Sequence, residues 1–472
     1  METTNIEELI KKIIIEKLQG KEETPQVVQE QKKAKYPSGT FETVDEAICA
    51  AKNAQQKFAD EPLLTRKKVV GAIRKAFLPL IEEIAKRTVE ETGMGVYEDK
   101  VVKNRLVLTN TPGVEDLYTE VQTGDGGMTL YELSPYGVIG SIAPSTNPTE
   151  TLIGNSIGML AAGNAVFFSP HPGARNVSQW VISKLNEVVN ETCGINNLVV
   201  TVANPTIEAA QEMMTHKDVN LLVVTGGPGV VSQAMRTGKK VIGAGPGNPP
   251  SIVDETANIE KAASDIVKGA SFDNNILCIA EKSVVAVDSI ADLLIFNMEK
   301  NGALLIKNKE DIQKLEKVAV AGGEHPNKKM VGKDATVLLD EAGIPYTFKP
   351  RLIICETTKD HPFAKVELMM PILPIVRVPD FDCALETALE LEGGLHHTAT
   401  MHSQNISRLN RAAKAFQTSI FVKNGPSYAG VGVDSEGTTT FTIATPTGEG
   451  TTSARHFARR RRCVLLDGFS IR

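Results

Sequence analysis

The sequence has few cysteines, and their spacing predicts neither disulfides nor a metal site. Only six of the 472 residues are cysteine, and no two of them form a CxxC pair. Disulfide frameworks and zinc sites both need closely spaced or regularly paired cysteines. The pattern fits a reducing cytoplasmic setting and leaves no metal site to predict. The six positions are Cys49, Cys193, Cys278, Cys355, Cys383 and Cys463.

The sequence also lacks a long apolar run and a strong excess of one charge. No segment approaches the roughly 20 apolar residues that a membrane-spanning helix needs, and no secretory signal peptide is recognisable. The formal net charge of -6 and the isoelectric point near 5.9 disfavour a nucleic acid or another polyanion as the main partner. We therefore expect a cytoplasmic protein whose partners include neither a membrane nor a nucleic acid.

Residues 1–20 stand apart from the rest of the chain as a predicted amphipathic helix. Their apolar residues recur at spacings of three and four, with Lys and Glu between them. Residues 21–40, rich in Gln, Lys and Glu, are typical of a flexible linker, so the helix is expected to dock onto another surface. Packing on its own domain is the alternative. Binding to a membrane surface is disfavoured because acidic and basic residues are mixed.

The chain is long enough for two or three domains, and its first large part alternates strands with helices. Residues 43–117 are predicted to be helical, with one long helix over residues 65–87. After them, alternating strands and helices predict an α/β fold with a doubly wound, Rossmann-type parallel sheet. We assign residues 41–125 and 138–243 to a nucleotide-binding domain. The predicted strands are residues 138–142, 165–168, 198–202, 220–225 and 239–243.

Ligands of such sheets lie at the carboxyl ends of the strands, so the turns there are candidate binding sites. Four turns, 143–148, 169–172, 225–229 and 243–250, are rich in small or polar residues. The turn Gly226-Gly227-Pro228-Gly229 lets a ligand approach the backbone and opens a helix whose N–H groups can hold a pyrophosphate. Such turns are also common without any ligand. Similarly, His171 can contact a phosphate or ribose, or can be a solvated loop histidine.

A second α/β unit, the catalytic domain, is predicted over residues 244–436. Early in it lies Cys278, between the polar pair Asn274-Asn275 and a segment of small and apolar residues. A thiol attacks aldehydes well, because its thiolate is accessible near neutral pH and the thiohemiacetal can lose a hydride to become a thioester. The alternative is a small core residue. The predicted strands are residues 283–288, 351–355, 372–378, 398–402 and 418–423.

A small β element is predicted from two separate segments, residues 126–137 and 437–472. The first is typical of a short strand pair, and the second has strand-like stretches at 438–443 and 463–466. The second also contains four consecutive arginines, residues 459–462, which can bind phosphates. In an acidic chain a solvated or intersubunit charge patch is favoured for them. We assign this element to oligomerisation.

Four features resemble the aldehyde dehydrogenase superfamily in their order and rough spacing: Asn147 after a Pro-Ser-Thr segment, the turn at 226–229, Cys278, and Glu367. The resemblance covers about residues 43–455. Within the superfamily, the chain is most similar to the CoA-acylating aldehyde dehydrogenases of bacterial microcompartments, which act on propionaldehyde or acetaldehyde. Its N-terminal helix and linker resemble their encapsulation peptide, and the Arg-rich tail and the Ser-Pro-His-Pro loop are also typical of them.

The resemblance implies a reaction, its cofactors and residue roles. It implies NAD- and CoA-dependent oxidation of a short-chain aldehyde to acyl-CoA, in which Cys278 attacks and the Asn147 amide and the Cys278 N–H hold the oxyanion. Glu367 is implied as a ribose ligand. The family's adenosine-ribose lysine is replaced near Ser169, which leaves NAD and NADP both open. The expected cofactor-binding residues are Thr146, Ser169, His171, Pro172, Thr225, Gly226, Gly227, Pro228, Gly245 and Glu367.

One departure from the hydrolytic members predicts the acceptor of the acyl group. Those enzymes carry a Glu-Leu-Gly-Gly-Lys type segment whose Glu activates water, and Gly243 stands in its place here. Losing a positioned general base typically slows a step by about 10²–10⁴-fold, so the thioester on Cys278 is expected to await the thiol of CoA. CoA is implied to enter the cleft that the nicotinamide cofactor vacates.

Three other functions stay open. A hydrolytic NAD(P)-dependent aldehyde dehydrogenase would need another base. Acyl-phosphate reductases that form semialdehydes also lack the Glu, but are not expected to carry the N-terminal helix. A non-catalytic, shell-associated scaffold is disfavoured by the intact Asn147 and Cys278. The resemblance also implies a location inside a microcompartment, a shell protein as the partner of residues 1–20, and a homo-oligomer, either dimer or tetramer.

Overall fold

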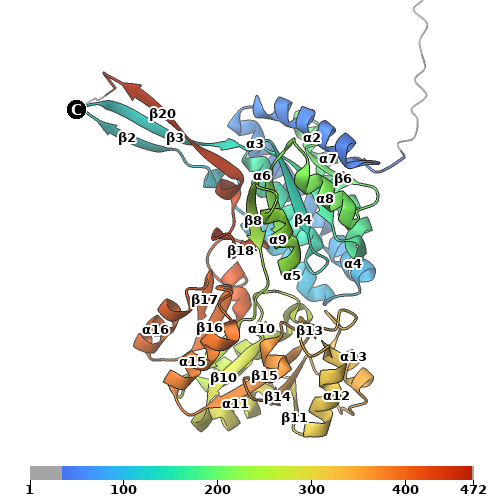
Figure 1. Cartoon of the computed structure of the whole chain (residues 1–472), viewed down its shortest axis with the longest axis vertical. Helices are drawn as coiled ribbons and strands as arrows, with labels where there is room; N and C mark the ends of the chain where they lie inside the picture. The colour runs from blue at the N-terminus through green and yellow to red at the C-terminus, as the bar shows by residue number, and fades with distance from the viewer. Residues whose placement is uncertain (1–34, 470–472) are drawn as a thin grey trace, which may run out of the picture. The chain divides into compact units, whose positions relative to one another are not determined.

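The computed structural model describes residues 35–469 (Figure 1). The helix predicted over residues 1–20 and nearly all of the predicted linker lie outside this range. Within it, no helix is long and apolar enough to cross a membrane. The described residues form two parallel sheets covered by helices, together with smaller antiparallel sheets.

Four helices form the segment predicted to be helical from residue 43 onward. The first begins after Thr43, whose side chain accepts a hydrogen bond from the Glu46 N–H while Glu46 accepts one from the Thr43 N–H. The prediction of a single helix over residues 65–87 is wrong. The helix is interrupted at a 3₁₀ turn that contains Pro79, which has no N–H to continue an α-helix. The helices are α2 (Val44–Ala59), α3 (Leu63–Phe77), α4 (Ile81–Thr92) and α5 (Tyr97–Asn110).

The first parallel sheet has six strands in the order β1-β6-β5-β4-β7-β8. The chain runs outward from β4 to β6 and then from β7 to β8, which confirms the predicted doubly wound topology. The reversal places β4 beside β7, and ligands of such sheets bind at the carboxyl ends of this pair. The strands are β1 (Thr40–Phe41), β4 (Val138–Ala143), β5 (Ala165–Pro170), β6 (Val199–Val202), β7 (Val219–Thr225) and β8 (Lys240–Ala244).

Helices and strands of this sheet share one apolar core. Every residue of β5 is buried, as expected for a parallel strand with helices on both faces. Phe167 and Phe168 on this strand point to opposite faces, and both are fully buried. The remaining helices of this part are α6 (Pro148–Ala161), α7 (Arg175–Cys193), α8 (Ile207–Thr215) and α9 (Pro228–Met235).

The second parallel sheet has seven strands in the order β11-β14-β15-β10-β9-β16-β17. Strands β9 and β11 were not predicted. The strands are β9 (Pro250–Val253), β10 (Ser283–Val287), β11 (Ala303–Ile306), β14 (Leu352–Glu356), β15 (Ile372–Val378), β16 (Thr398–His402) and β17 (Ile420–Lys423). The helices are α10 (Ile259–Ser271), α11 (Asp288–Lys300), α12 (Lys309–Ala319), α13 (Ala335–Ala342), α14 (Pro362–Lys365), α15 (Phe381–Glu392) and α16 (Ile406–Phe416).

A three-stranded antiparallel sheet joins two segments far apart in the sequence, and Figure 1 shows it apart from both parallel sheets. It consists of β2 (Glu120–Gly124), β3 (Gly127–Pro135) and β20 (Ala458–Leu466). The strand predicted at 463–466 therefore begins earlier and contains all four arginines. Their side chains stay exposed, and the guanidinium of Arg460 lies 3.8 Å from the ring centre of Tyr131.

Two short strand pairs complete the sheets. The strand-like stretch predicted at 438–443 is mostly loop, and only its last residue belongs to a strand. That strand is β18 (Ile443–Ala444), which pairs with β19 (Gly450–Thr451). The other pair is β12 (Val320–Ala321) with β13 (His325–Pro326).

Candidate active site at the Cys278 loop

The turns predicted to bind the cofactor lie at the carboxyl edge of the six-stranded sheet. Strands β4, β5, β7 and β8 end at or inside these turns, and all neighbouring strands of the sheet are parallel. Their carboxyl ends therefore share one edge. Of the predicted cofactor residues, this edge brings together Thr146, Ser169, His171, Pro172, Thr225, Gly226, Gly227, Pro228 and Gly245.

The Gly-rich turn leads directly into α9, with Gly227 as the residue before the first helical turn. A Cβ atom on Gly227 or Gly229 would have nothing within 4 Å, so the backbone faces open space. The N–H groups and the dipole of a helix N-terminus favour an anion. The turn therefore has room for a phosphate group.

The other edge residues differ in how far their polar groups are already engaged. His171 accepts a hydrogen bond from the Gly173 N–H at its Nδ1, at 3.0 Å. Its side chain reaches solvent, and partial desolvation of the ring, followed by the charge of Lys328, lowers its pKa. Ser169 is buried at the end of β5. The Thr225 hydroxyl lies 3.1 Å from that of Thr442 and is thus already hydrogen-bonded.

Cys278 follows three consecutive residues in the left-handed backbone region. Asp273, Asn274 and Asn275 have φ angles of 49°, 55° and 63°. Asp and Asn adopt this conformation more readily than other residues with a side chain, which explains the polar turn before the thiol. The Asn275 side chain donates a hydrogen bond of 3.0 Å to the carbonyl of Glu281 and so closes the loop around Cys278.

The buried Lys282 holds this loop from the inside. Its Nζ donates to the Asn275 carbonyl at 2.7 Å, to the Asn275 Oδ1 at 2.6 Å and to the Leu277 carbonyl at 3.0 Å. Burial lowers the pKa of Lys282 to about 8, against the opposing charges of Glu367 and Cys278. A cation this close to a thiol favours the thiolate form.

The carboxylate of Glu367 raises the pKa of the Cys278 thiol, whereas the charge of Lys282 lowers it. Burial raises the pKa of Cys278 to about 12, and the charge of Glu367 contributes to this rise. Burial also raises the pKa of Glu367 to about 7, although Lys282 and a hydrogen bond from the Gly247 N–H partly offset it. Among residues 35–469 the Oε1 of Glu367 has no hydrogen-bond partner. This buried oxygen therefore keeps its capacity to accept a hydrogen bond.

Two further buried ionisable side chains lie near the thiol. Glu281 accepts hydrogen bonds from the N–H and the hydroxyl of Ser427 at 2.8 and 2.6 Å, and burial raises its pKa to about 7. His397 lies against Gly247, and burial followed by the charge of Lys282 lowers its pKa to about 4. Its Nε2 has no partner in the described part of the chain. An imidazole with so low a pKa stays neutral at working pH, and a deprotonated Nε2 can accept a hydrogen bond.

A buried lysine links Asn147 to the loop of the thiol. Asn147 precedes α6 and is 8% exposed. Its Oδ1 accepts a hydrogen bond of 2.6 Å from the Nζ of Lys103, and the same Nζ lies 2.5 Å from the Oδ2 of Asp273. Asp273 begins the left-handed stretch before Cys278. The Lys103 side chain therefore connects Asn147 with the loop that carries Cys278.

Gly243 lies in β8, where its N–H donates to the Thr447 hydroxyl at 3.0 Å. Its φ lies outside the left-handed region, so the backbone conformation does not require glycine here. Space is limited, however, because a Cβ atom would lie 2.8 Å from the Cγ1 of Val231. A larger side chain at residue 243 would have to displace Val231.

The sequence analysis did not single out several ionisable residues of this site. Lys103 stands three residues after Lys100, and such a pair on a helix usually indicates a solvated face. Nothing in the sequence shows that both are buried. Lys282 and Glu281 could have been noticed as charged neighbours of Cys278 inside an otherwise apolar segment.

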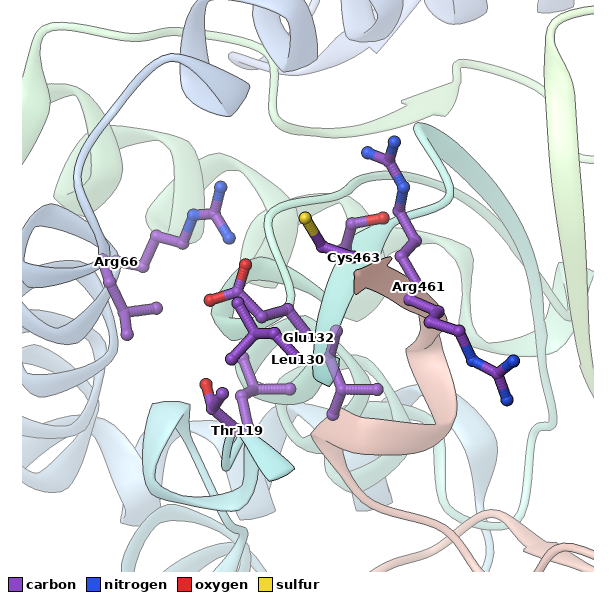
Figure 2. A pocket seen from close by; sticks show the side chains of 11 residues that line it. Arg66, Thr119, Leu130, Glu132, Arg461 and Cys463 are labelled. Atoms are coloured by element: carbon purple, nitrogen blue, oxygen red, sulfur yellow. The ribbon is translucent and has the colours of Figure 1, made fainter. Parts of the chain in front are cut away.

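A separate pocket lies between α3 and the three-stranded sheet. Figure 2 shows Arg66 on one side of it and Arg461 with Cys463 on the other, with Leu130 and Glu132 between them. None of the residues predicted to be catalytic or cofactor-binding lines this pocket. It is therefore distinct from the Cys278 site.

Comparisons with known proteins show which proteins this chain is similar to. The model of the "Aldehyde dehydrogenase family" matches residues 16–437. Over 100% of both chains, the sequence is 57% identical to the propanal dehydrogenase (CoA-propanoylating) of Salmonella typhimurium.

Solved structures give the same result. A propionaldehyde dehydrogenase of Rhodopseudomonas palustris, with bound CoA and an acylated cysteine, is 52% identical with a TM-score of 0.91, covering 92% of this chain and 99% of that chain. A propionaldehyde dehydrogenase from the fucose utilisation bacterial microcompartment of Clostridium phytofermentans is 48% identical with a TM-score of 0.90, covering 92% and 100%.

Proposed function

The chain belongs to the aldehyde dehydrogenase family, and we propose that it oxidises a short-chain aldehyde such as propanal or acetaldehyde to acyl-CoA, with NAD as oxidant. The reaction passes through a thioester on Cys278 and is reversible. The observation that carries this proposal is the 52% identical relative whose structure holds CoA and an acylated cysteine. Cys278, in a loop shaped around one thiol, is the residue that we match to that cysteine.

The chemistry assigned to this chain begins at the thiol. Cys278 reacts as the thiolate, after the thiol has lost its proton. The sulfur forms a bond to the aldehyde carbon, the π bond of the carbonyl breaks, and the carbonyl oxygen takes the negative charge. The NH₂ group of Asn147 and the backbone N–H of Cys278 donate hydrogen bonds to this oxyanion. Collapse of the oxyanion expels a hydride and leaves the thioester, from which the thiol of CoA takes the acyl group and frees Cys278.

The edge of the six-stranded sheet fits a nicotinamide cofactor. When bound, NAD supplies the acceptor for the hydride. The open space at Gly227 and Gly229 suits the pyrophosphate, and the Oε1 of Glu367, which has no hydrogen-bond partner among residues 35–469, suits a ribose hydroxyl. We assign Ser169 and His171 to the adenosine side of the cofactor.

Hydrolysis competes poorly in this proposal because Gly243 stands where the hydrolytic relatives carry the Glu that activates water. CoA brings a thiol, and with an ordinary thiol pKa of about 8.5 a few per cent is already thiolate at neutral pH. The thioester is therefore expected to last until CoA arrives.

Turnover with and without CoA tests this function. With propanal and NAD alone, we expect one burst of NADH equal to the enzyme concentration, and steady NADH formation only after CoA is added. Steady NADH and free propionate without CoA would instead establish a hydrolytic enzyme. No NADH under either condition would favour a non-catalytic scaffold.

We further propose that residues 1–20 bind a shell protein and place the enzyme inside a bacterial microcompartment. The amphipathic pattern of these residues and the polar linker after them support this docking role. A relative that is 48% identical comes from a fucose utilisation bacterial microcompartment. The residues assigned to chemistry all belong to the compact unit Tyr36–Arg472, so docking is not needed for catalysis.

The three-stranded sheet is proposed as the oligomerisation element of a dimer or tetramer. Its last strand exposes Val464 and Leu466 on one face, with Leu466 72% exposed, and Val121 is exposed on the other face of the sheet. Neighbouring exposed apolar side chains on a small sheet are typical of protein–protein contacts. The pocket beside it adds a recess that a partner side chain can fill (Figure 2).

A further inference from the structure

Four charged side chains are buried together between α5, the start of α6 and the loop before Cys278. They are Lys100, Lys103, Glu150 and Asp273, and the side chain of each is at most 1% exposed. Lys103 contacts Glu150 at 3.0 Å and Asp273 at 2.5 Å, while Lys100 contacts Asp273 at 3.0 Å. Two cations thus face two carboxylates, and the cluster carries no net charge.

Two of these charges, on Lys103 and Asp273, are stabilised by their neighbours despite their burial, whereas burial lowers the pKa of Lys100. Burial disfavours the charge on Lys103, but the carboxylates of Asp273 and Glu150 outweigh it and hold the pKa of Lys103 above its ordinary value. Burial likewise opposes ionisation of Asp273, and Lys100 and Lys103 outweigh it and lower the pKa of Asp273. Lys103 therefore stays a cation throughout the range in which an enzyme works.

Lys103 has a further contact that an ion-pair cluster does not need. Its Nζ donates to the Oδ1 of Asn147 at 2.6 Å. An ammonium group has donors only, so it can face the amide oxygen of Asn147 but not the amide nitrogen. The NH₂ group must then point away from Lys103. Its one contact in the described residues is a long one of 3.4 Å to the Thr146 hydroxyl, so it is nearly free to donate elsewhere.

We propose that Lys103 is a positioning residue that fixes the orientation of the Asn147 amide and thereby aims its NH₂ group at the oxyanion. This inference rests on the proposed function, in which Asn147 is an oxyanion donor. The C=O and NH₂ ends of the Asn147 side-chain amide differ little in shape, but the first accepts hydrogen bonds and the second donates them. Without Lys103, the amide can turn its oxygen toward the developing charge, which replaces a stabilising contact with a repulsive one.

A double-mutant cycle separates positioning from general support of the fold. Asn147→Ala removes the donor and is expected to lower kcat by about 10²–10³-fold. Lys103→Met removes the orienting donor and is expected to lower kcat by about 10–100-fold, with the KM for NAD and CoA little changed. In the Asn147→Ala background, Lys103→Met should lower kcat less than about twofold further, because no amide is left to orient.

Lys100→Met is the matched control. Lys100 is equally buried and also paired with Asp273, but it contacts the Thr146 carbonyl instead of the Asn147 side chain. Its effect on kcat should be the same in the wild-type and Asn147→Ala backgrounds. Lys103→Arg keeps a donor-only cation and should recover most of the kcat lost in Lys103→Met.

Lys103→Met leaves a buried carboxylate without its cation, which can destabilise the fold. A second comparison avoids this imbalance: Lys103→Met/Glu150→Gln removes one charge of each sign, and Glu150→Gln alone is its reference. The difference in kcat between these two variants should again nearly disappear in the Asn147→Ala background. If the wild type is active and Lys103→Met lowers kcat equally in the wild-type and Asn147→Ala backgrounds, the positioning role is overturned. An absence of CoA-dependent NADH formation in the wild type itself would overturn the proposed function instead.

Discussion

The backbone of Gly247 passes so close to Cys278 that a Cβ atom on residue 247 would lie 2.6 Å from the carbonyl oxygen of Cys278. On its other side the same atom would lie 2.9 Å from the Cγ of His397. No side chain fits between them at protein packing density. The Gly247 N–H also bonds to Glu367. This glycine therefore connects the turn at 243–250, which follows β8, with the thiol loop and with the Glu367 carboxylate that raises the thiol pKa.

Cys278→Ala is expected to abolish aldehyde oxidation and the reverse reduction of acyl-CoA while leaving the fold intact. Without the thiol no thiohemiacetal forms, and alanine fills most of the same space. Residual turnover should be below about 1% of the wild type, which is the scale expected for loss of a nucleophile. NADH formation with propanal, NAD and CoA, and NADH consumption with propionyl-CoA, measure the two directions.

Cys355→Ala is the control for this change. Cys355 is fully buried in β14, and burial raises its pKa to about 12, as it does for Cys278. Its loss should cost about 1 kcal/mol of stability and leave turnover near the wild-type value. Turnover well above 1% in Cys278→Ala would assign the nucleophile to another residue.

Glu367→Gln is expected to speed alkylation of Cys278 at alkaline pH. The pKa of Glu367 is about 7, so above this pH its negative charge helps to keep the pKa of Cys278 near 12. Glutamine removes that charge, lowers the pKa of the thiol and raises the thiolate fraction at a given pH. Well below pH 7 Glu367 is protonated in the wild type, so the two rates should converge.

Iodoacetamide labelling followed by mass spectrometry of the Cys278 peptide gives these rates across the pH range. Glu281→Gln is the matched control, since Glu281 is also buried with a pKa of about 7 but is engaged by Ser427. It should change the labelling rate less than Glu367→Gln does. Identical rates for Glu367→Gln and the wild type above pH 8 would show that burial alone sets the thiol pKa.

The first sheet was predictable because its strands are buried, separated by long helices and bounded by Gly or Pro turns. The strand predicted at 165–168 became β5 (Ala165–Pro170), and that at 220–225 became β7 (Val219–Thr225). The thiol loop was also visible, because an Asn-Asn pair before a lone cysteine indicates an unusual backbone. Local sequence carries both signals.

The supporting residues of the site were not predictable, because their burial depends on contacts between distant segments. Lys103 and Asp273 are 170 positions apart and meet only in the folded chain, at 2.5 Å. The pair His396-His397 shows the same limit. His397 is buried and its Nδ1 lies 2.9 Å from the Thr398 hydroxyl, whereas His396 is exposed and contacts the Phe416 carbonyl. Nothing in their sequence distinguishes the two.

Deletion of residues 1–20 is expected to leave NAD- and CoA-dependent turnover in solution unchanged and to abolish co-localisation with a microcompartment shell. The residues assigned to chemistry lie in the unit Tyr36–Arg472, and a polar linker separates the predicted helix from them. Turnover and melting temperature of the purified protein, with fluorescence imaging of a tagged shell, check both parts. A large drop in melting temperature would show that the helix packs on its own domain.

Gly243→Glu is expected to divert part of the acyl group from CoA to water. A carboxylate within reach of the thioester can deprotonate water, and a positioned base speeds such a step by about 10²–10⁴-fold. A Cβ atom at residue 243 would lie 2.8 Å from the Cγ1 of Val231. The change is therefore best made together with Val231→Ala, which removes the obstructing atom, and Val231→Ala alone shows what the extra space does.

Gly243→Gln/Val231→Ala is the decisive control, because glutamine has the size of glutamate but cannot act as a base. With propanal and NAD, Gly243→Glu/Val231→Ala should release at least about tenfold more free propionate than this control, and the excess should grow as the carboxylate ionises. If both variants oxidise aldehyde in a single burst and release equally little acid, the missing base is not what protects the thioester. Protection would then come from exclusion of water from the Cys278 pocket, the same burial that raises the pKa of the thiol to about 12.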